Sequence, residues 1–489
     1  MGDVLLLRRR LARLHALDVA VFRRATRNEA PRLDAALYPL SRLADNSKLW
    51  MLVSAGLAAA GGRRGRRSSL RGMVSVGITS AVANGLLKPL VRRRRPLATR
   101  SDWLTRVAAV PASSSFPSGH SASAAAFAVG ATMELPVVGP PLGLLASAVG
   151  FSRVRTRVHY PGDVVAGFAL GAGIALLTRK LWPVAPDEPA AVSRSFTHRS
   201  RGAMADGAGL SIVVNPSAGS DDEIGVADAL RTAFPAAEVV EPDDSDGMGA
   251  ALDHAARATV IGIVGGDGSI NAAAERAMRA AIPLAIVPGG TLNHFARDLG
   301  ITDADDAIAA VRAGELARVD VGMIADKPFL NTASFGSYAE LVDAREQLED
   351  RIGKWPAMAV ALVRVLRTAR PIEVILDGVD TKVWMIFIGN CEYQPAGMAP
   401  GWRERLDDGL LDVRYVDGGA SFSRLRLVLA VLTGQLGRSK VYRRLLVPEL
   451  EIRSLEGPLR LARDGETFDG GTTVTVTKHD IGLTVYVTP

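Results

Sequence analysis

The chain has 489 residues, enough for two or three domains that each bury a core. Apolar residues make up 48% of it but aromatic residues only 5%, and the single cysteine, Cys391, excludes a disulfide framework and a cysteine-based zinc cluster. The net charge of +7 is uneven, because residues 1–200 hold 29 Lys and Arg against 10 Asp and Glu, whereas the remainder holds 29 against 41. A basic, apolar first part favours an anionic membrane surface over nucleic acid as its partner, and the acidic second part is typical of a cytosolic domain.

The first part of the chain has the pattern of a membrane protein. Residues 1–48 mix apolar positions with arginines at helical spacing, which predicts an interfacial helical segment and not a signal peptide. Five apolar stretches follow, and several are shorter than the ~20 residues that span a bilayer comfortably. Their repetition nevertheless favours an all-α transmembrane helical bundle at 49–181 over a soluble Ala-rich bundle. The stretches lie at about 49–61, 70–91, 121–134, 137–152 and 163–178.

The second part has the pattern of a two-lobe soluble domain. Residues 182–209 are rich in Pro, Asp, Ser, Arg and Gly, which predicts a linker. Short β-branched runs then alternate with Ala-rich stretches, as in βα units on a parallel sheet, and predict an α/β lobe at 210–320. Strand-rich segments around a helix near 340–369 predict a second, β-rich and mostly antiparallel lobe at 321–489. The clearest predicted strands are Leu210–Val214, Thr259–Val264, Pro283–Val287, Ile372–Leu376, Trp384–Gly389, Leu411–Tyr415 and Thr472–Val476.

Three polar clusters lie at ends of the apolar stretches. Two stretches separate the second cluster from the third, so all three can meet on one side of a membrane. Phosphoryl transfer through a covalent intermediate needs a nucleophile and an acid for the leaving group, and we assign His159 as nucleophile, Asp163 as its orienter and His120 as general acid. Cationic side chains would form a cup for a phosphate, and a helix N-terminus would add its amides. The cup is Lys88, Arg95 and Arg153, and the helix opens at Ser118 and Gly119.

These residues resemble the type 2 phosphatidic acid phosphatase superfamily. Its pattern of Lys-x6-Arg-Pro, Pro-Ser-Gly-His and Ser-Arg-x5-His-x3-Asp is matched completely between about residues 40 and 180, and the resemblance implies the same roles. Vanadium haloperoxidases share this site, so an oxidoreductase is a rival interpretation. Those enzymes are soluble, however, and the apolar stretches suit a lipid substrate. Within Arg92–Arg95 only Arg95 belongs to the motif, and its neighbours are expected to be solvated or lipid-facing.

Three glycine-containing loops follow predicted strands of the second part. Strand ends that turn through glycine into helices are where backbone amides approach phosphates, and loops at one edge of a parallel sheet converge. The first loop is Asn215–Gly219, the second is Gly265–Ser269 and the third is Pro288–Arg297. Together they predict one site at which backbone amides approach phosphates.

These loops resemble the catalytic domain of the diacylglycerol kinase and sphingosine kinase superfamily, from about residue 210 to 489. The resemblance also includes Asn331–Gly336 and Asp407–Leu410. It implies that ATP and Mg²⁺ are cofactors, that Asp267 orients the magnesium nucleotide, and that Glu466 or Asp464 takes the proton from a lipid hydroxyl. A structural Mg²⁺ would bind Asp408 and the Leu410 carbonyl. The implied ATP-binding residues are Asn215, Pro216, Ser217, Ala218, Gly219, Gly265, Gly266, Asp267, Gly268, Ser269 and Thr291.

Three positions depart from the family's usual residues. Ala218 replaces Ser, Ser269 replaces Thr with its hydroxyl retained, and His294 replaces an Asp beside the acceptor site, which bears on the choice of lipid. Asp267 and Glu466 are both present, and their presence disfavours the interpretation that the second part is an inactive module that only binds lipid. An alternative is that only one of the two domains is active and the other is a lipid-binding or anchoring module.

The sequence leaves the lipids open. Phosphatidate-type lipids and polyprenyl phosphates or pyrophosphates suit the phosphatase equally, and diacylglycerol is the default acceptor of the kinase. Both parts would act on membrane lipids in a multi-pass protein of the cell membrane. Because ATP is cytoplasmic and the fifth stretch leads from Asp163 to the linker, we expect the kinase in the cytoplasm and the phosphatase site on the extracytoplasmic face. The oligomeric state is not predicted.

Overall fold

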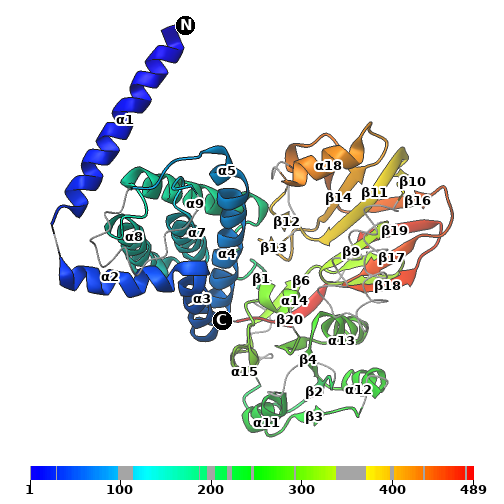
Figure 1. Ribbon diagram of the computed structural model, residues 1–489. Helices are drawn as coiled ribbons and strands as arrows, with labels where there is room; N and C mark the ends of the chain where they lie inside the picture. Colours follow the sequence, from blue (N-terminus) through cyan, green and yellow to red (C-terminus); the bar gives the residue numbers. More distant parts are fainter. Residues whose placement is uncertain are drawn as a thin grey trace. The chain divides into compact units, whose positions relative to one another are not determined.

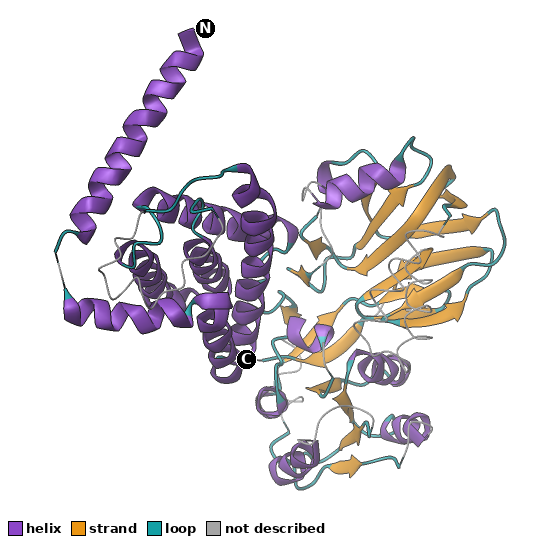
Figure 2. Ribbon diagram, viewed as in Figure 1, coloured by secondary structure: helices purple, strands orange, loops and turns teal. Residues whose placement is uncertain are grey.

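The structure is a computed structural model, and it divides the chain into two compact units, Met1–Val184 and Ala185–Pro489. Figure 1 follows the chain by colour, and Figure 2 separates a helical first unit from a second unit that contains the strands. The described residues are 2–28, 30–96, 114–186, 188–194, 204–216, 223–243, 247–290, 293–336, 370–396, 401–432, 436–479 and 482–488.

Every described element of the first unit is a helix, as the sequence predicts. The segment expected to lie at the interface, residues 1–48, contains the first three of them and ends where the fourth begins. The helices are α1 (Gly2–Thr26), α2 (Pro31–Leu43), η1 (Asp45–Ser47), α3 (Lys48–Ala60), α4 (Gly62–Ala81), η2 (Val82–Leu87), α5 (Lys88–Leu90), α7 (Gly119–Glu134), η3 (Pro136–Val138), α8 (Gly139–Arg155) and α9 (Pro161–Leu181).

Three helical stretches of the described residues are long and apolar enough to cross a membrane. They are Gly62–Leu90, Pro136–Arg155 and Pro161–Lys180. The other two predicted stretches form α3 and α7, which have 13 and 16 residues and are shorter than a usual span. Large apolar side chains such as Leu86, Leu144 and Val165 are exposed around the unit. A lipid environment would cover them.

Helix α7 lies at the centre of the first unit and packs against α4, α8 and α9. Gly167 and Gly171 of α9 make the closest approach, because a Cβ at Gly171 would lie 2.0 Å from the Ala122 carbonyl oxygen and one at Gly167 would lie 2.5 Å from that of Ser118. Small residues four apart allow such helix contact in membranes. The contact fixes the start of α7 against the start of α9, and the predicted site residues lie at or next to these two helix starts.

The first sheet of the second unit is largely parallel, as predicted. Strands β3, β2, β4 and β5 are parallel neighbours, and β20 continues the sheet beside β5. Strand β6 pairs antiparallel with β20, and β1 with β6. The strands are β1 (Ser193–Arg194), β2 (Leu210–Val214), β3 (Glu238–Val240), β4 (Val260–Gly265), β5 (Leu284–Pro288), β6 (Leu316–Val319) and β20 (Leu483–Tyr486), and the helices are α11 (Glu223–Ala233), α12 (Gly247–Ala255), α13 (Asp267–Ala280), α14 (His294–Asp298) and α15 (Ala304–Ala313).

The second sheet is antiparallel at every described pairing, which agrees with the predicted β-rich lobe. The helix expected near 340–369 lies outside the described residues. The strands are β7 (Gly322–Ile324), β8 (Lys327–Phe329), β9 (Thr332–Gly336), β10 (Ile372–Leu376), β11 (Val379–Asn390), β14 (Leu411–Asp417), β15 (Tyr442–Val447), β16 (Leu450–Ser454), β17 (Arg460–Arg463), β18 (Glu466–Asp469) and β19 (Thr473–Lys478), with the separate pair β12 (Tyr393–Gln394) and β13 (Trp402–Arg403), and helices α18 (Ser423–Leu432) and η5 (Leu436–Arg438).

Two segments depart from a simple division into successive lobes. Part of the predicted linker belongs to the second unit, since Ala190 is buried in its core and β1 pairs with β6. Strand β20 comes from the region assigned to the β-rich lobe but inserts between β6 and β5 of the first sheet. The second lobe is therefore an insertion between strands of the first.

Candidate active sites

The three polar clusters of the first unit come together, as the sequence predicts. Arg95 donates from Nη1 to the Val158 carbonyl at 2.9 Å and lies 3.3 Å from His159 Nε2. Lys88, on α5, lies beside the start of α7, where its Nζ would be 3.5 Å from a Cβ at Gly119. Arg153, at the end of α8, is the third cation of the predicted cup. The starts of α7 and α9 and the end of α8 thus meet at one end of the bundle.

The contacts of His159 fix which of its nitrogens can act. Nδ1 lies 2.7 Å from the Ser115 carbonyl oxygen, which only accepts, so Nδ1 carries the proton and Nε2 carries the lone pair. Burial lowers the pKa of His159 to about 4, so the ring is neutral at neutral pH. Nε2 faces Arg95 of the cup. A neutral imidazole with its lone pair toward a cationic cup is suited to attack a phosphate.

The partner of Asp163 differs from the one expected. Its Oδ2 lies 3.7 Å from His159 Nδ1, farther than the Ser115 carbonyl, whereas its Oδ1 accepts from Arg93 Nη1 at 2.6 Å. Arg93 also donates to Asp18 of α1 at 2.6 Å and stacks over the Tyr160 ring. The expectation that the neighbours of Arg95 are solvated or lipid-facing is therefore wrong for Arg93, because a fully buried carboxylate requires a cation.

His120 and Ser118 lie at the first turn of α7. Ser118 is the N-cap, and its hydroxyl accepts from the Ser121 amide, so the serine fixes the start of the helix. His120 Nε2 lies 2.7 Å from Oδ1 of Asp45, a residue of η1. Sequence reasoning missed Asp45, because one carboxylate 75 residues earlier carries no recognisable spacing.

The glycine loops of the second unit converge at the carboxyl edge of the parallel sheet. Asn215, after β2, donates from Nδ2 to the Ser269 hydroxyl at 2.6 Å, and the Gly289 amide after β5 donates to the Gly265 carbonyl at 2.9 Å. A Cβ at Gly290 would lie 2.6 Å from the Cα of Gly266. Such contact requires glycine and leaves the backbone open to a phosphate. Pro216 and Gly268 lie in the same loops; Ser217, Ala218, Gly219 and Thr291 lie outside the described residues.

Asp267, the first residue of α13, joins the second loop to the third. Its carboxylate accepts from the amides of His294 at 3.1 Å and Phe295 at 3.2 Å, and from Asn331 Nδ2 at 3.3 Å. Asn331 in turn accepts from Arg403, which is fully buried and forms an ion pair with Asp298 at 2.6 Å. Arg403 had no signal in the sequence, although its guanidinium connects both lobes of the second unit.

The two candidate bases have different surroundings. Asp464 is in the turn between β17 and β18, and its oxygens accept from the amides of Leu330, Asn331 and Thr332 at 2.8 to 2.9 Å. Burial raises its pKa to about 6, and the three amides act in the opposite direction. Glu466 is exposed, with Oε1 3.5 Å from the position of a Cβ on Gly268. Glu466 therefore faces the glycine loop, and Asp464 holds the backbone.

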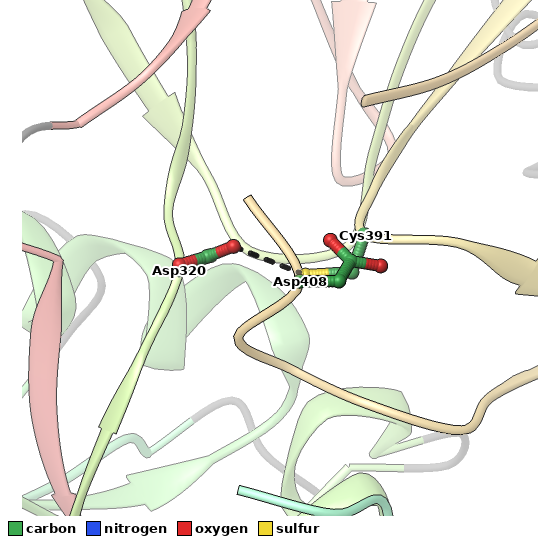
Figure 3. Close-up of side chains that lie close together, drawn as sticks. All are labelled: Asp320, Cys391 and Asp408. Carbon is green, nitrogen blue, oxygen red and sulfur yellow. Dashed lines mark hydrogen bonds between the residues drawn. The ribbon is translucent and has the colours of Figure 1, made fainter. Parts of the chain in front are cut away.

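Asp408, one of the two residues expected to bind a structural Mg²⁺, lies in a small cluster with Asp320 and Cys391. The ligand atoms of Asp320, Cys391 and Asp408 lie within 4.8 Å of one another (Figure 3). Two carboxylates and the nearby Leu410 carbonyl suit a hard cation, whereas burial raises the pKa of the Cys391 thiol to about 12 and makes it a poor ligand for Mg²⁺. Lys478 lies 3.4 Å from Asp320, so an ammonium already balances part of the charge.

Two known families match the two parts of the chain. The profile of the PAP2 superfamily matches residues 70–186, and that of the diacylglycerol kinase catalytic domain matches residues 209–324. A YegS-like lipid kinase of Pseudomonas aeruginosa is 31% identical over 216 residues, which cover 42% of this chain and 69% of the kinase.

The phosphatase part has relatives of its own. The decaprenylphosphoryl-5-phosphoribose phosphatase of Mycobacterium tuberculosis is 34% identical over 158 residues, which cover 30% of this chain and 80% of that phosphatase. An uncharacterized protein of Synechocystis is 28% identical over 184 residues, and this chain spans 42% of its length. The chain therefore belongs to two families, the PAP2 superfamily through its first unit and the diacylglycerol kinase catalytic domain family through its second.

Proposed function

We propose that the chain is a bifunctional enzyme of lipid phosphate chemistry. The first unit hydrolyses a phosphate ester of a membrane lipid through a phosphohistidine, and the second transfers a phosphate from ATP to a lipid alcohol, with diacylglycerol as the first candidate. The observation that carries the phosphatase is the neutral His159, whose Nε2 lone pair faces Arg95. The name of the mycobacterial relative adds phosphates on polyprenyl-linked sugars to the candidate substrates.

In the phosphatase, Nε2 of His159 attacks phosphorus while the bond to the lipid oxygen breaks. His120 gives its proton to that oxygen, so the lipid leaves as an alcohol. Water then attacks phosphorus and gives a proton to His120 while the bond from phosphorus to Nε2 breaks, so phosphate leaves and His159 is restored. Lys88, Arg95 and Arg153 neutralise the phosphoryl oxygens throughout.

In the kinase, the lipid hydroxyl gives its proton to Glu466 as its oxygen attacks the γ-phosphorus of ATP, and ADP leaves. The amides of Gly265–Ser269 hold the phosphates, and Asp267 keeps the second and third loops together. Magnesium, when bound, supplies charge neutralisation on the phosphates, and Asp320 and Asp408 would hold a structural ion. One lipid pair shared by both sites would form a futile cycle, so the two sites act on different lipids or different leaflets.

The proposed sidedness follows from the directions of the helices. Helices α7 and α9 begin at the phosphatase site, and α9, with 21 residues and a length of about 30 Å, ends just before the second unit. The far end of α7 carries Glu134, which binds the buried Arg71 at 2.6 Å. The arginines near the start of α4 therefore lie at the end away from the site, as the positive-inside rule requires for a cytoplasmic kinase.

Thiol labelling of intact cells tests this sidedness. Asn28 and Ala60 are exposed; the Asn28 carbonyl contacts Arg155 on the site side, and Ala60 ends α3 at the other side. Cys391 is buried with a raised pKa, so its thiol gives no background. A membrane-impermeant reagent should label Asn28→Cys and not Ala60→Cys. The opposite labelling pattern would mean that the membrane topology is the reverse of the one proposed. Labelling of neither variant would place both sites in the cytoplasm.

A substrate panel tests the two activities. The purified protein is incubated with lipid phosphates, and separately with lipid alcohols and ATP, and products are identified by mass. His159→Ala should abolish phosphate release and leave ATP-dependent phosphorylation intact, whereas Asp267→Ala should do the reverse. Loss of both activities in a folded single variant would contradict two independent sites, and a wild-type protein active in one assay only would leave the other unit as a binding or anchoring module.

A further inference from the structure

A carboxylate from the N-terminal segment contacts the proposed general acid. Asp45 Oδ1 lies 2.7 Å from His120 Nε2. Asp45 precedes residues 70–186, which match the PAP2 superfamily, so the segment expected only to lie at the membrane surface contributes a group to the site.

The backbone around Asp45 is held in an unusual conformation. Asn46 and Ser47 both adopt left-handed φ values, of 52° and 61°. Residues other than glycine rarely adopt this region, and such strain tends to persist at functional sites. Ala44 and Trp50 on either side are buried, and the Trp50 ring packs 5.2 Å from that of Phe127 on α7. The turn is therefore fixed to the same helix that carries His120.

The charges around the pair define what Asp45 can do. Burial lowers the pKa of His120, and the neighbouring cations Arg153 and Lys88 lower it further, whereas the hydrogen bond with Asp45 acts in the opposite direction. Arg153 lies 3.8 Å from Asp45 and donates to Ser41 at 2.6 Å. The hydrogen bond with His120 holds the pKa of Asp45 below its usual value. Half of the Asp45 side chain is also exposed to water, so Asp45 is ionised.

We propose that Asp45 is a positioning residue that orients His120 and stabilises its protonated form. An ionised carboxylate only accepts, so the Nε2 proton stays in the hydrogen bond and Nδ1 is the nitrogen that delivers its proton to the leaving lipid oxygen. The proton moves from Nδ1 to oxygen as the phosphorus–oxygen bond breaks, and Asp45 remains a carboxylate. The inference rests on the proposed phosphatase activity and adds a group that opposes the loss of the proton from its acid, which burial and two neighbouring cations favour.

Asp45→Asn removes the charge and keeps the shape. We expect kcat for an alkyl phosphate to fall about 10- to 100-fold, because leaving-group protonation is weakened. For p-nitrophenyl phosphate, whose leaving group needs no proton, we expect a change of less than about threefold. The basic limb of the pH profile for the alkyl phosphate should move to lower pH, since His120 would lose its proton more easily. Asp45→Glu should recover part of the alkyl phosphate activity.

Asp34→Asn is the matched control. Asp34 lies in the same N-terminal segment, and it forms an ion pair of 2.7 Å with Arg155, which is not part of the cup. It should leave the ratio of the two activities and the pH limb unchanged. If Asp45→Asn lost equal activity on both substrates, or if the basic limb of its pH profile did not move, the contact between Asp45 and His120 would have a structural role only. A lower KM with unchanged kcat would instead mean that Asp45 competes with the substrate phosphate.

A measurement without turnover separates this inference from the proposed function. Histidine NMR titration, with the His120 signal assigned by His120→Gln, should show a lower pKa of His120 in Asp45→Asn than in wild type. An unchanged pKa would overturn the inference even in an active enzyme. A lowered pKa in a protein that hydrolyses neither substrate would refute the phosphatase and leave the coupling of the two residues intact.

Discussion

Replacing Arg93 by Gln should destabilise the first unit and leave the second unaffected. Arg93 binds the fully buried Asp163 at 2.6 Å, and its own side chain is 22% exposed. Removing one partner of a buried ion pair costs about 3–5 kcal/mol, and the partial exposure of Arg93 reduces our expectation to about 2–3 kcal/mol. At roughly 2–4 °C for each kcal/mol in a unit of this size, the melting temperature should fall by about 4–12 °C.

The assay is a thermal melt of the purified protein in detergent, followed by circular dichroism, with the transition of the second unit as internal reference. Arg92→Gln is the matched control, because Arg92 is exposed in the same run of arginines and its loss should shift the transition little. The double variant Arg93→Gln/Asp163→Asn should be more stable than Arg93→Gln alone, since Asp163, the fully buried one of the two carboxylates that lose Arg93, no longer carries a charge. Equal melting temperatures for Arg92→Gln and Arg93→Gln would refute the reasoning.

Three further predictions concern the two active sites. The acid limb of phosphatase kcat/KM should lie near pH 4, because His159, with a pKa of about 4, stays neutral above that pH; an acid limb near 6.5 would contradict this. Glu466→Gln should lower kinase kcat at least ~100-fold with little change in stability. Asp464→Asn should instead lower the stability of the second unit, because three amides lose a charged acceptor. The reverse pattern would make Asp464 the base. Asp408→Asn should raise the Mg²⁺ concentration needed for half-maximal kinase activity without changing the KM for ATP, and an unchanged Mg²⁺ titration would exclude a metal at that cluster.

Local and periodic features of the sequence predicted much of the structure. Leu210–Val214 is a strand because its β-branched residues are buried on both faces, and glycine at the following strand ends marks where backbones approach closely. The meeting of Arg95 and His159 was predictable because each cluster stands at an end of an apolar stretch. Two stretch ends that are separated by an even number of membrane crossings lie on the same side of the membrane.

The remaining features depend on pairs far apart in the chain. Asp45 is an isolated carboxylate whose role appears only when η1 packs on α7, and Asp18 reaches Arg93 only because α1 lies beside the start of α9. Neither position has a local pattern that distinguishes it from a surface acid. Arg93 was hidden in a run of four arginines, in which charge alone does not tell which guanidinium is buried.

The position of β20 between β6 and β5 has a consequence for biogenesis. The first unit is complete at residue 184 and can fold while the rest of the chain is being synthesised. The nucleotide-binding sheet, by contrast, has an open edge beside β5 until residues 483–486 have left the ribosome. Such an unpaired edge invites pairing with other chains. A membrane unit that inserts first would hold the nascent kinase at the bilayer during that interval. A stop codon only a few residues before β20 would abolish the kinase without changing any of its three glycine-containing loops.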